Sequence, residues 1–158
     1  MADSSAKLRI ALGADHAGFQ VKESIKKFLE SAGHAVDDVG TGSEESVDYP
    51  DFAREAAVRV VAGQDDLGIL VCGTGIGMTI AANKIAGVRA ALVCDPATAR
   101  LAREHNNANV LAVAGRTLSG EKAIEIVREF LAAEFAGGRH ERRVNKISLL
   151  DGERKSKS

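Results

Sequence analysis

Short apolar runs rich in isoleucine, valine and leucine alternate along this chain with longer stretches whose apolar residues recur at helical spacing. This alternation is typical of repeated strand–helix units around a parallel sheet, because strands covered by helices on both faces read as continuous apolar runs. The predicted strands are residues 8–13, 35–39, 67–72, 89–94 and 109–114. The predicted helices are residues 19–31, 51–62, 76–85, 96–105 and 119–133.

Five strand–helix units in succession predict a three-layer, doubly wound α/β fold of the Rossmann or flavodoxin-like type. We expect the five strands to be parallel and to lie in the order 2-1-3-4-5. The chain has 158 residues, the size of one domain, so 1–158 is predicted to form a single domain with its core and tail in 7–150. The polar ends, 1–6 and 153–158, are predicted to be flexible.

A glycine pair at 137–138 interrupts the last long helix, and a further segment follows it. Val144, Ile147 and Leu150 recur in that segment at helical spacing, which predicts a C-terminal tail helix. An apolar stripe along an otherwise charged helix is stable only when another surface covers it. We therefore expect the tail helix to have a packing partner.

The charge of the chain is nearly balanced, with 21 lysines and arginines against 22 aspartates and glutamates. No uniform positive field is available to attract nucleic acid or anionic lipid, so neither is an expected partner. No apolar run approaches the roughly 20 residues that span a bilayer, and no apolar signal segment begins the chain. We expect a cytoplasmic protein. Two cysteines, Cys72 and Cys94, give no disulfide framework.

Ligands of open α/β sheets bind beyond the carboxyl ends of the strands. Several polar residues and glycines follow the predicted strands at that edge: Asp15, His16, Cys72, Gly73, Gly75, Gly77, Asp95, Gly115 and Arg116. The glycines at 73, 75 and 77 let backbone N–H groups approach a ligand, and the helix that begins there adds a positive dipole end. The alternative is that these glycines only form a tight turn.

Two familiar phosphate-binding motifs do not match the glycine loop at 72–77. A dinucleotide fingerprint belongs after the first strand, where Asp15 would repel a pyrophosphate, and a nucleoside triphosphate loop would end in Gly-Lys-Ser/Thr. A small anion formed during a reaction fits better. The thiolate form of Cys72 is favoured at a helix N-terminus and can act as a base or a nucleophile. The alternative for Cys72 is that it is only a small buried apolar side chain. We assign that apolar role to Cys94.

A basic cluster follows the glycine pair. Arg139 and Arg143 are four residues apart on the predicted tail helix, where two guanidinium groups suit a phosphate dianion; the alternative is a solvated charged surface. The spacing of the histidines matches no metal motif, and His34 and His105 have ordinary explanations at helix ends. With 4% aromatic residues and no tryptophan, a sugar phosphate is favoured over a stacked nucleobase.

Six motifs resemble ribose-5-phosphate isomerase type B and its relatives that act on galactose and allose 6-phosphates. They occur in order over about residues 8–150 as GADHAG (13–18), DYP (48–50), CGTGIG (72–77), AANK (81–84), HNN (105–107) and GRH (138–140). The resemblance implies a metal-free, cofactor-free aldose–ketose isomerase of the pentose phosphate pathway. It would interconvert D-ribose 5-phosphate and D-ribulose 5-phosphate through a cis-enediolate.

The resemblance also implies residue roles. The base that moves a proton between C1 and C2 would be Cys72, and Thr74 with His105 would open the furanose ring. The remaining residues would bind substrate: Gly73, Gly75 and Gly77 the enediolate oxygen, Asp15 and Asn106 sugar oxygens, and His16, Arg139, Arg143 and Arg116 the phosphate. The resemblance implies a homodimer whose sites take the His105–Asn106 pair and part of the basic tail from the neighbouring subunit.

Two alternative functions stay open on the residues alone. One is a hexose-6-phosphate isomerase, because one more carbon is a matter of pocket depth worth about 1–3 kcal/mol. The other is a non-enzymatic module that binds a small anion, such as a receiver or flavin-binding domain on the same sheet. A phospho-accepting receiver would carry an aspartate where this chain has Cys72, which argues against it.

Overall fold

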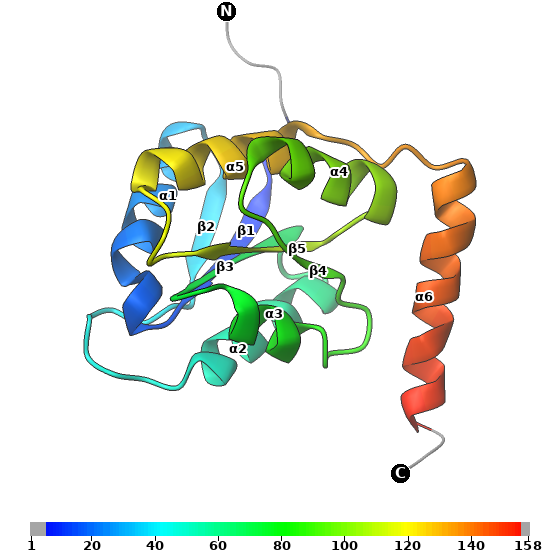
Figure 1. Ribbon diagram of the computed structural model, residues 1–158, viewed down its shortest axis with the longest axis horizontal. Coiled ribbons are helices and arrows are strands. Elements are labelled where there is room, and N and C mark those ends of the chain that lie inside the picture. The colour runs from blue at the N-terminus through cyan, green and yellow to red at the C-terminus, as the bar shows by residue number, and fades with distance from the viewer. Residues whose placement is uncertain (1–5, 156–158) are drawn as a thin grey trace, which may run out of the picture.

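The computed structural model describes residues 6–155 and contains one parallel sheet of five strands. The strands are β1 (Arg9–Ala14), β2 (Ala35–Asp38), β3 (Leu67–Cys72), β4 (Ala90–Leu92) and β5 (Val110–Ala114). They lie in the order β2-β1-β3-β5-β4, with helices above and below the sheet (Figure 1). The predicted α/β class and the five strands are confirmed, but the predicted order 2-1-3-4-5 is wrong in its last two positions.

The composition of the last two strands explains their order. β5 is buried along most of its length and pairs with β3 on one side and β4 on the other. β4 has only three residues, and Leu92 at its end is exposed. Burying the continuous apolar strand inside the sheet and leaving the short one at the edge removes more apolar surface from water. A succession of five strand–helix units does not specify whether the fourth or the fifth strand lies next to the third.

The helices cover the two faces of the sheet unequally. One face carries α1 (Phe19–Ser31), α4 (Pro96–Asn106) and α5 (Gly120–Ala132), and the other carries α2 (Tyr49–Val61) and α3 (Ile76–Ala82). Side chains alternate between these layers along β3, so that Ile69 and Val71 join the first core and Leu70 and Cys72 join the second. The thiol at the end of β3 therefore points toward α2 and α3.

Two helix boundaries differ from the prediction by more than one residue, for local reasons. α2 begins at Tyr49, two residues earlier than predicted, because Pro50 is accommodated in the first turn of a helix. α3 ends at Ala82, three residues earlier, because the Asn83 side chain bonds the backbone of Ala90 as both donor and acceptor, at 3.0 and 2.8 Å. These bonds hold the end of α3 against the start of β4.

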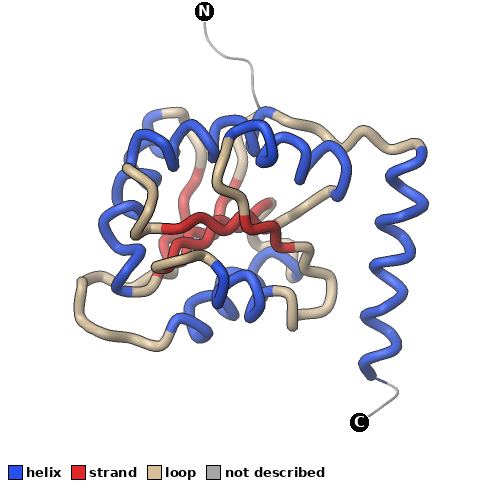
Figure 2. Tube along the Cα trace, viewed as in Figure 1, coloured by secondary structure: helices blue, strands red, loops and turns tan. Residues whose placement is uncertain are grey.

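The predicted tail helix is present as α6 (Arg139–Lys155) and lies beside the domain rather than on the sheet (Figure 2). It is held at its far end by Asp151, which accepts from Gly87 N–H at 2.8 Å, and by Arg154, which donates to Asn83 O at 3.0 Å. Val144 is buried, whereas Ile147 and Leu150 of the predicted stripe are exposed. The helix includes residues 153–155; positions 1–5 and 156–158 of the predicted flexible ends lie outside the described residues.

Candidate functional site

The turn after β1 carries the first two predicted site residues. Asp15 is buried and caps the 3-10 turn η1 (His16–Gly18), where its Oδ1 accepts from Gly18 N–H at 3.0 Å. His16 follows, and its Nδ1 accepts from Val47 N–H at 3.1 Å. Because Nδ1 is the acceptor, the neutral imidazole carries its proton on Nε2 and presents a donor. Both side chains therefore have a defined orientation at the carboxyl edge of the sheet.

The glycine loop follows β3 at the same edge. Cys72 is 4% exposed and ends the strand, and Gly75 adopts a left-handed conformation with φ of 77° immediately before α3. A side chain at Gly75 would be strained by this φ and would also meet Leu92 Cδ1 at 2.5 Å. Thr74 is exposed, and its Oγ1 accepts from Ile76 N–H at 3.2 Å. The loop thus needs glycine where its backbone turns.

Two side chains lie against the glycine loop from neighbouring elements. A Cβ built on Gly73 would be 3.0 Å from the guanidinium of Arg116, which follows β5, and the backbone N–H of Arg116 donates to Gly73 O at 3.1 Å. A Cβ built on Gly77 would be 2.6 Å from the ring of Tyr49 at the start of α2. The structure therefore places Arg116 against the predicted glycine loop, and it also places Tyr49 there, for which the sequence predicted no role.

The position of Tyr49 in the sequence marks it as a candidate site residue. It is the single tyrosine of the chain, and it stands in the DYP motif directly before a helix-initiating proline. Nothing in the sequence pairs that motif with Gly77, because the contact joins segments 28 positions apart. We name the set at this edge the thiol cluster; it comprises Asp15, His16, Tyr49, Cys72, Gly73, Thr74, Gly75, Gly77 and Arg116.

Four predicted residues, His105, Asn106, Arg139 and Arg143, gather with His140, for which no role was predicted, where the end of α4 meets the start of α6. The rings of His105 and His140 stack with their centroids 4.2 Å apart and their planes at 8°. Burial, the neighbouring His105, and the positive charges of Arg139 and Arg143 all lower the pKa of His140. Asn106 is the last residue of α4. We name this set, His105, Asn106, Arg139, His140 and Arg143, the tail cluster.

The two clusters lie at opposite edges of the sheet. Cys72 pairs with Ala114 at the carboxyl ends of β3 and β5, where Asp95 also starts α4. The eleven residues of α4 then run back to the amino ends, about 16 Å along the helix axis, because the next strand is parallel. Figure 1 shows the end of α4 beside α6 and away from the β3–α3 loop. One chain therefore does not bring Cys72 together with His105.

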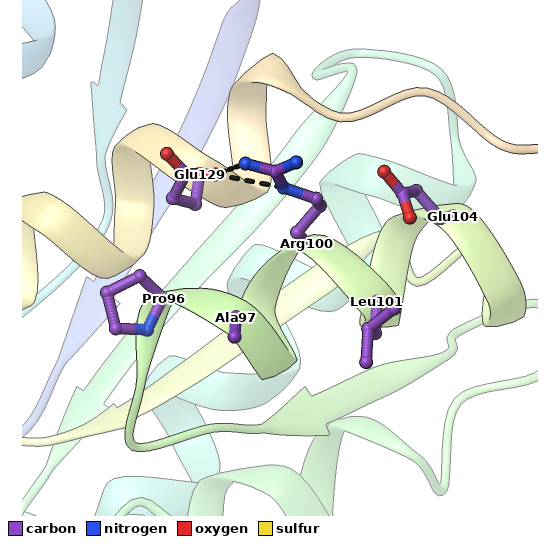
Figure 3. A pocket seen from close by; sticks show the side chains of 6 residues that line it. All are labelled: Pro96, Ala97, Arg100, Leu101, Glu104 and Glu129. Carbon is purple, nitrogen blue, oxygen red and sulfur yellow. Dashed lines mark hydrogen bonds and ion pairs between the residues drawn. The ribbon is translucent and has the colours of Figure 1, made fainter.

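A surface hollow lies away from both clusters, between α4 and α5 (Figure 3). It is lined by Pro96, Ala97, Arg100, Leu101, Glu104 and Glu129. Arg100 crosses it and donates to Glu129 Oε2 through Nη2 at 2.8 Å. Its charge is already neutralised, and the hollow includes no residue of either cluster.

Within residues 6–155, no three histidine, cysteine, aspartate or glutamate side chains gather closely enough to hold a metal ion. Over the same range, no helix combines the length and the apolar character needed to span a membrane.

The thiol and the glycine loop at the carboxyl end of the third strand place this chain among the α/β proteins that bind a small molecule at that end of a parallel sheet. Comparison with known proteins narrows the class. The model of the family described as Ribose/Galactose Isomerase matches residues 10–147. The chain belongs to this family.

Individual relatives agree with the family. The ribose-5-phosphate isomerase B of Escherichia coli strain K12 is 46% identical over 146 residues, which cover 92% of this chain and 98% of that protein. The solved structure of the Thermotoga maritima ribose 5-phosphate isomerase is 51% identical, with a TM-score of 0.89 over 91% of this chain and 99% of that one. The ribose-5-phosphate isomerase B of Mycoplasma genitalium, solved with bound ribulose-5-phosphate, is 45% identical, with a TM-score of 0.88 over 92% and 97%.

Proposed function

We propose that this chain interconverts D-ribose 5-phosphate and D-ribulose 5-phosphate. The observation that carries the proposal is the 45% identity, over nearly the whole of both chains, to a relative solved with bound ribulose-5-phosphate. The position of Cys72 supports it, because the thiol ends a buried strand beside a glycine loop that can stabilise a developing anion.

In this proposal the thiol cluster carries the proton transfer. The Cys72 thiolate removes the proton from C2 of the open-chain aldose and returns it to C1, while O1 gains a proton and O2 loses one. Backbone N–H groups at Gly73, Gly75 and Gly77 hold the enediolate oxygen between these steps. Asp15 binds sugar hydroxyls, and Arg116, whose guanidinium lies over Gly73, assists at the phosphate.

The tail cluster supplies the remaining steps from a second subunit. Thr74 and His105 open the furanose ring by proton transfer, Asn106 binds a sugar oxygen, and Arg139 and Arg143 join His16 at the phosphate. The separation of the two clusters within one chain supports a homodimer with shared sites, since a twofold arrangement can place one subunit's tail cluster at the other's thiol cluster.

The distribution of exposed apolar side chains also supports self-association. Ile76 and Ile80 on α3 are 52% and 58% exposed, and Leu92 beside Gly75 is 40% exposed. Ile147 and Leu150 on α6 are exposed as well. Apolar patches of this kind mark interaction surfaces. In this proposal the whole chain is a single domain. The second copy covers α6 and the exposed side chains of Ile76, Ile80 and Leu92 around Gly75.

An isomerisation assay on ribose 5-phosphate, run with and without EDTA, tests the activity. We expect chelator-insensitive turnover in the purified protein and a loss of about 10²–10⁴-fold in kcat for Cys72→Ala. Cys94→Ala is the matched control and should keep full activity, because that cysteine lies outside both clusters and is exposed, so the buried role predicted for it is wrong. Full activity in Cys72→Ala would move the base to another residue. Full activity in a species that light scattering shows to be a monomer would exclude the shared site.

The family description leaves a second candidate, isomerisation of a hexose 6-phosphate. One extra carbon changes the pocket depth required, and a difference of this size is worth about 1–3 kcal/mol, or about 5- to 150-fold in kcat/KM. Side-by-side kcat/KM values for ribose 5-phosphate, allose 6-phosphate and galactose 6-phosphate decide between them.

A cytoplasmic location completes the proposal. Both Cys72 and Cys94 are free thiols, and thiols stay reduced in a compartment buffered by glutathione or thioredoxin. Fractionation of the source cells, followed by detection of the protein with an antibody, would test this location.

A further inference from the structure

Lys22 is a fully buried lysine that the proposed mechanism does not use. It lies on α1, is 1% exposed, and is among the largest buried side chains of the described residues. Its ammonium group donates to both carboxylate oxygens of Asp38, at 2.8 and 3.0 Å, and to Thr41 O at 3.0 Å. It also lies 3.1 Å from Glu23 Oε1 and 5.2 Å from the centre of the Phe19 ring. Burial of a lysine is costly unless its charge is paired in this way.

These contacts fix the start of the segment that leaves β2, residues 39–48. Asp38, which pairs with Lys22, accepts from Gly40 N–H at 3.1 Å, and Thr41 N–H donates to Ala14 O at 3.0 Å at the end of β1. Gly40 is so close to both neighbours that a Cβ there would be 2.8 Å from Ala14 N and from Lys22 Cδ. The segment therefore crosses the carboxyl end of β1 directly above the Lys22 side chain.

The far end of the same segment reaches the thiol cluster twice. Val47 N–H donates to His16 Nδ1 at 3.1 Å, which selects the tautomer that presents Nε2–H. Tyr49 then begins α2 with its ring against Gly77. A displacement of the segment would release the imidazole and the ring together, although neither touches Lys22.

We propose that Lys22 is a positioning residue: by bonding Asp38 and Thr41 at the start of segment 39–48, it holds His16 in the orientation that binds substrate and Tyr49 against Gly77. This inference rests on the proposed function for the role of His16 at the phosphate. The lowered pKa of Asp38 is consistent with it, since burial would raise that pKa and the bonds from Lys22, Gly40 and Lys26 outweigh the effect. In this proposal the His16 contact at the phosphate is equally strong in the ground state and the transition state, so its misplacement raises KM more than it lowers kcat.

The test compares three variants. Lys22→Met removes the charge and keeps the chain length, Lys22→Arg restores a cation that can bond a carboxylate with two N–H groups, and Lys27→Met is the control at an exposed lysine of the same helix. Asp38→Asn is measured as well, because it weakens the same contact while keeping its shape, and it decides the question if Lys22→Met does not fold.

Two of the readouts do not depend on activity. Tyr49 is the single tyrosine and the chain has no tryptophan, so intrinsic fluorescence reports on Tyr49 alone. The nitrogen chemical shifts of His16 report its tautomer. For Lys22→Met we expect KM to rise about tenfold with kcat changed less than about threefold. We also expect iodide quenching of Tyr49 to increase and the His16 tautomer preference to weaken, with Lys22→Arg closer to the wild type than Lys22→Met and Lys27→Met unchanged.

The positioning role would be overturned if both Lys22→Met and Asp38→Asn kept the wild-type values of KM, of iodide quenching of Tyr49 and of the His16 nitrogen shifts. Equal losses in kcat and kcat/KM with unchanged fluorescence and His16 shifts would also overturn it. A wild-type protein inactive on ribose 5-phosphate would refute the proposed function instead, while the fluorescence and the His16 shifts would still decide whether Lys22 orients these two side chains.

Discussion

Mixing two inactive variants of this chain should restore activity. Cys72→Ala damages the thiol cluster and His105→Ala damages the tail cluster. These residues lie at opposite edges of the sheet, and α4, which runs from one edge to the other, is about 16 Å long. If each site takes Cys72 from one subunit and His105 from the other, a mixed dimer has one site with both lesions and one site with none. Neither homodimer has an intact site.

The size of the recovery follows from counting sites. Equal amounts of the two variants, dissociated and allowed to reassociate at random, give about half mixed dimers, each with one intact site of two. We therefore expect about one quarter of the wild-type kcat per subunit on ribose 5-phosphate. The measurement is the isomerisation rate before and after reassociation, with mixed dimers quantified through different affinity tags on the two chains.

A matched mixture controls for nonspecific recovery. Cys72→Ala reassociated with Cys72→Ser leaves every site without a thiol and should stay inactive. If tagged mixed dimers form at the expected fraction but the Cys72→Ala and His105→Ala mixture shows no recovery, the shared site is refuted. Appreciable activity in the His105→Ala homodimer alone would show that His105 is dispensable for ring opening.

Two further predictions concern stability and are measured by urea denaturation. Gly75→Ala should reduce the free energy of unfolding by about 2–4 kcal/mol, because its left-handed φ costs about 1–2 kcal/mol and Leu92 must also move. Gly63→Ala, with a φ of 74° and open space around it, should lose only the cost of the left-handed φ, about 1–2 kcal/mol. Stability should also fall in acid, because the pKa of Asp38 in the folded chain is lowered from 3.8. As the pH falls, the unfolded chain therefore binds this proton first. The contribution of Asp38 to the free energy of unfolding is present above about pH 3.8 and is lost as the pH falls through the pKa of the folded chain. Asp38→Asn should show a shallower decrease below about pH 5, and an unchanged slope would contradict the assignment.

The strands, most of the helices and one edge of the site could be predicted from the sequence. β3 and β5 are continuous apolar runs, which only a sheet covered on both faces can bury. Asp15 and His16 follow β1 and Cys72 ends β3, and the carboxyl ends of parallel strands share one edge. The roles of His105 and Asn106, in contrast, came from the resemblance, because a histidine at the end of a helix has ordinary explanations.

The remaining features depended on contacts between distant segments. The order of β4 and β5 follows from which strand loses more apolar surface to the interior, a comparison that needs the whole sheet. Tyr49 meets Gly77, and Lys22 bonds Thr41, only after their elements have packed. Local sequence determines where strands, helices and turns form, because backbone preferences and apolar spacing are local. Which side chains share a site is decided by tertiary packing, where α4 returns the chain to the opposite edge of the sheet and separates His105 from Cys72.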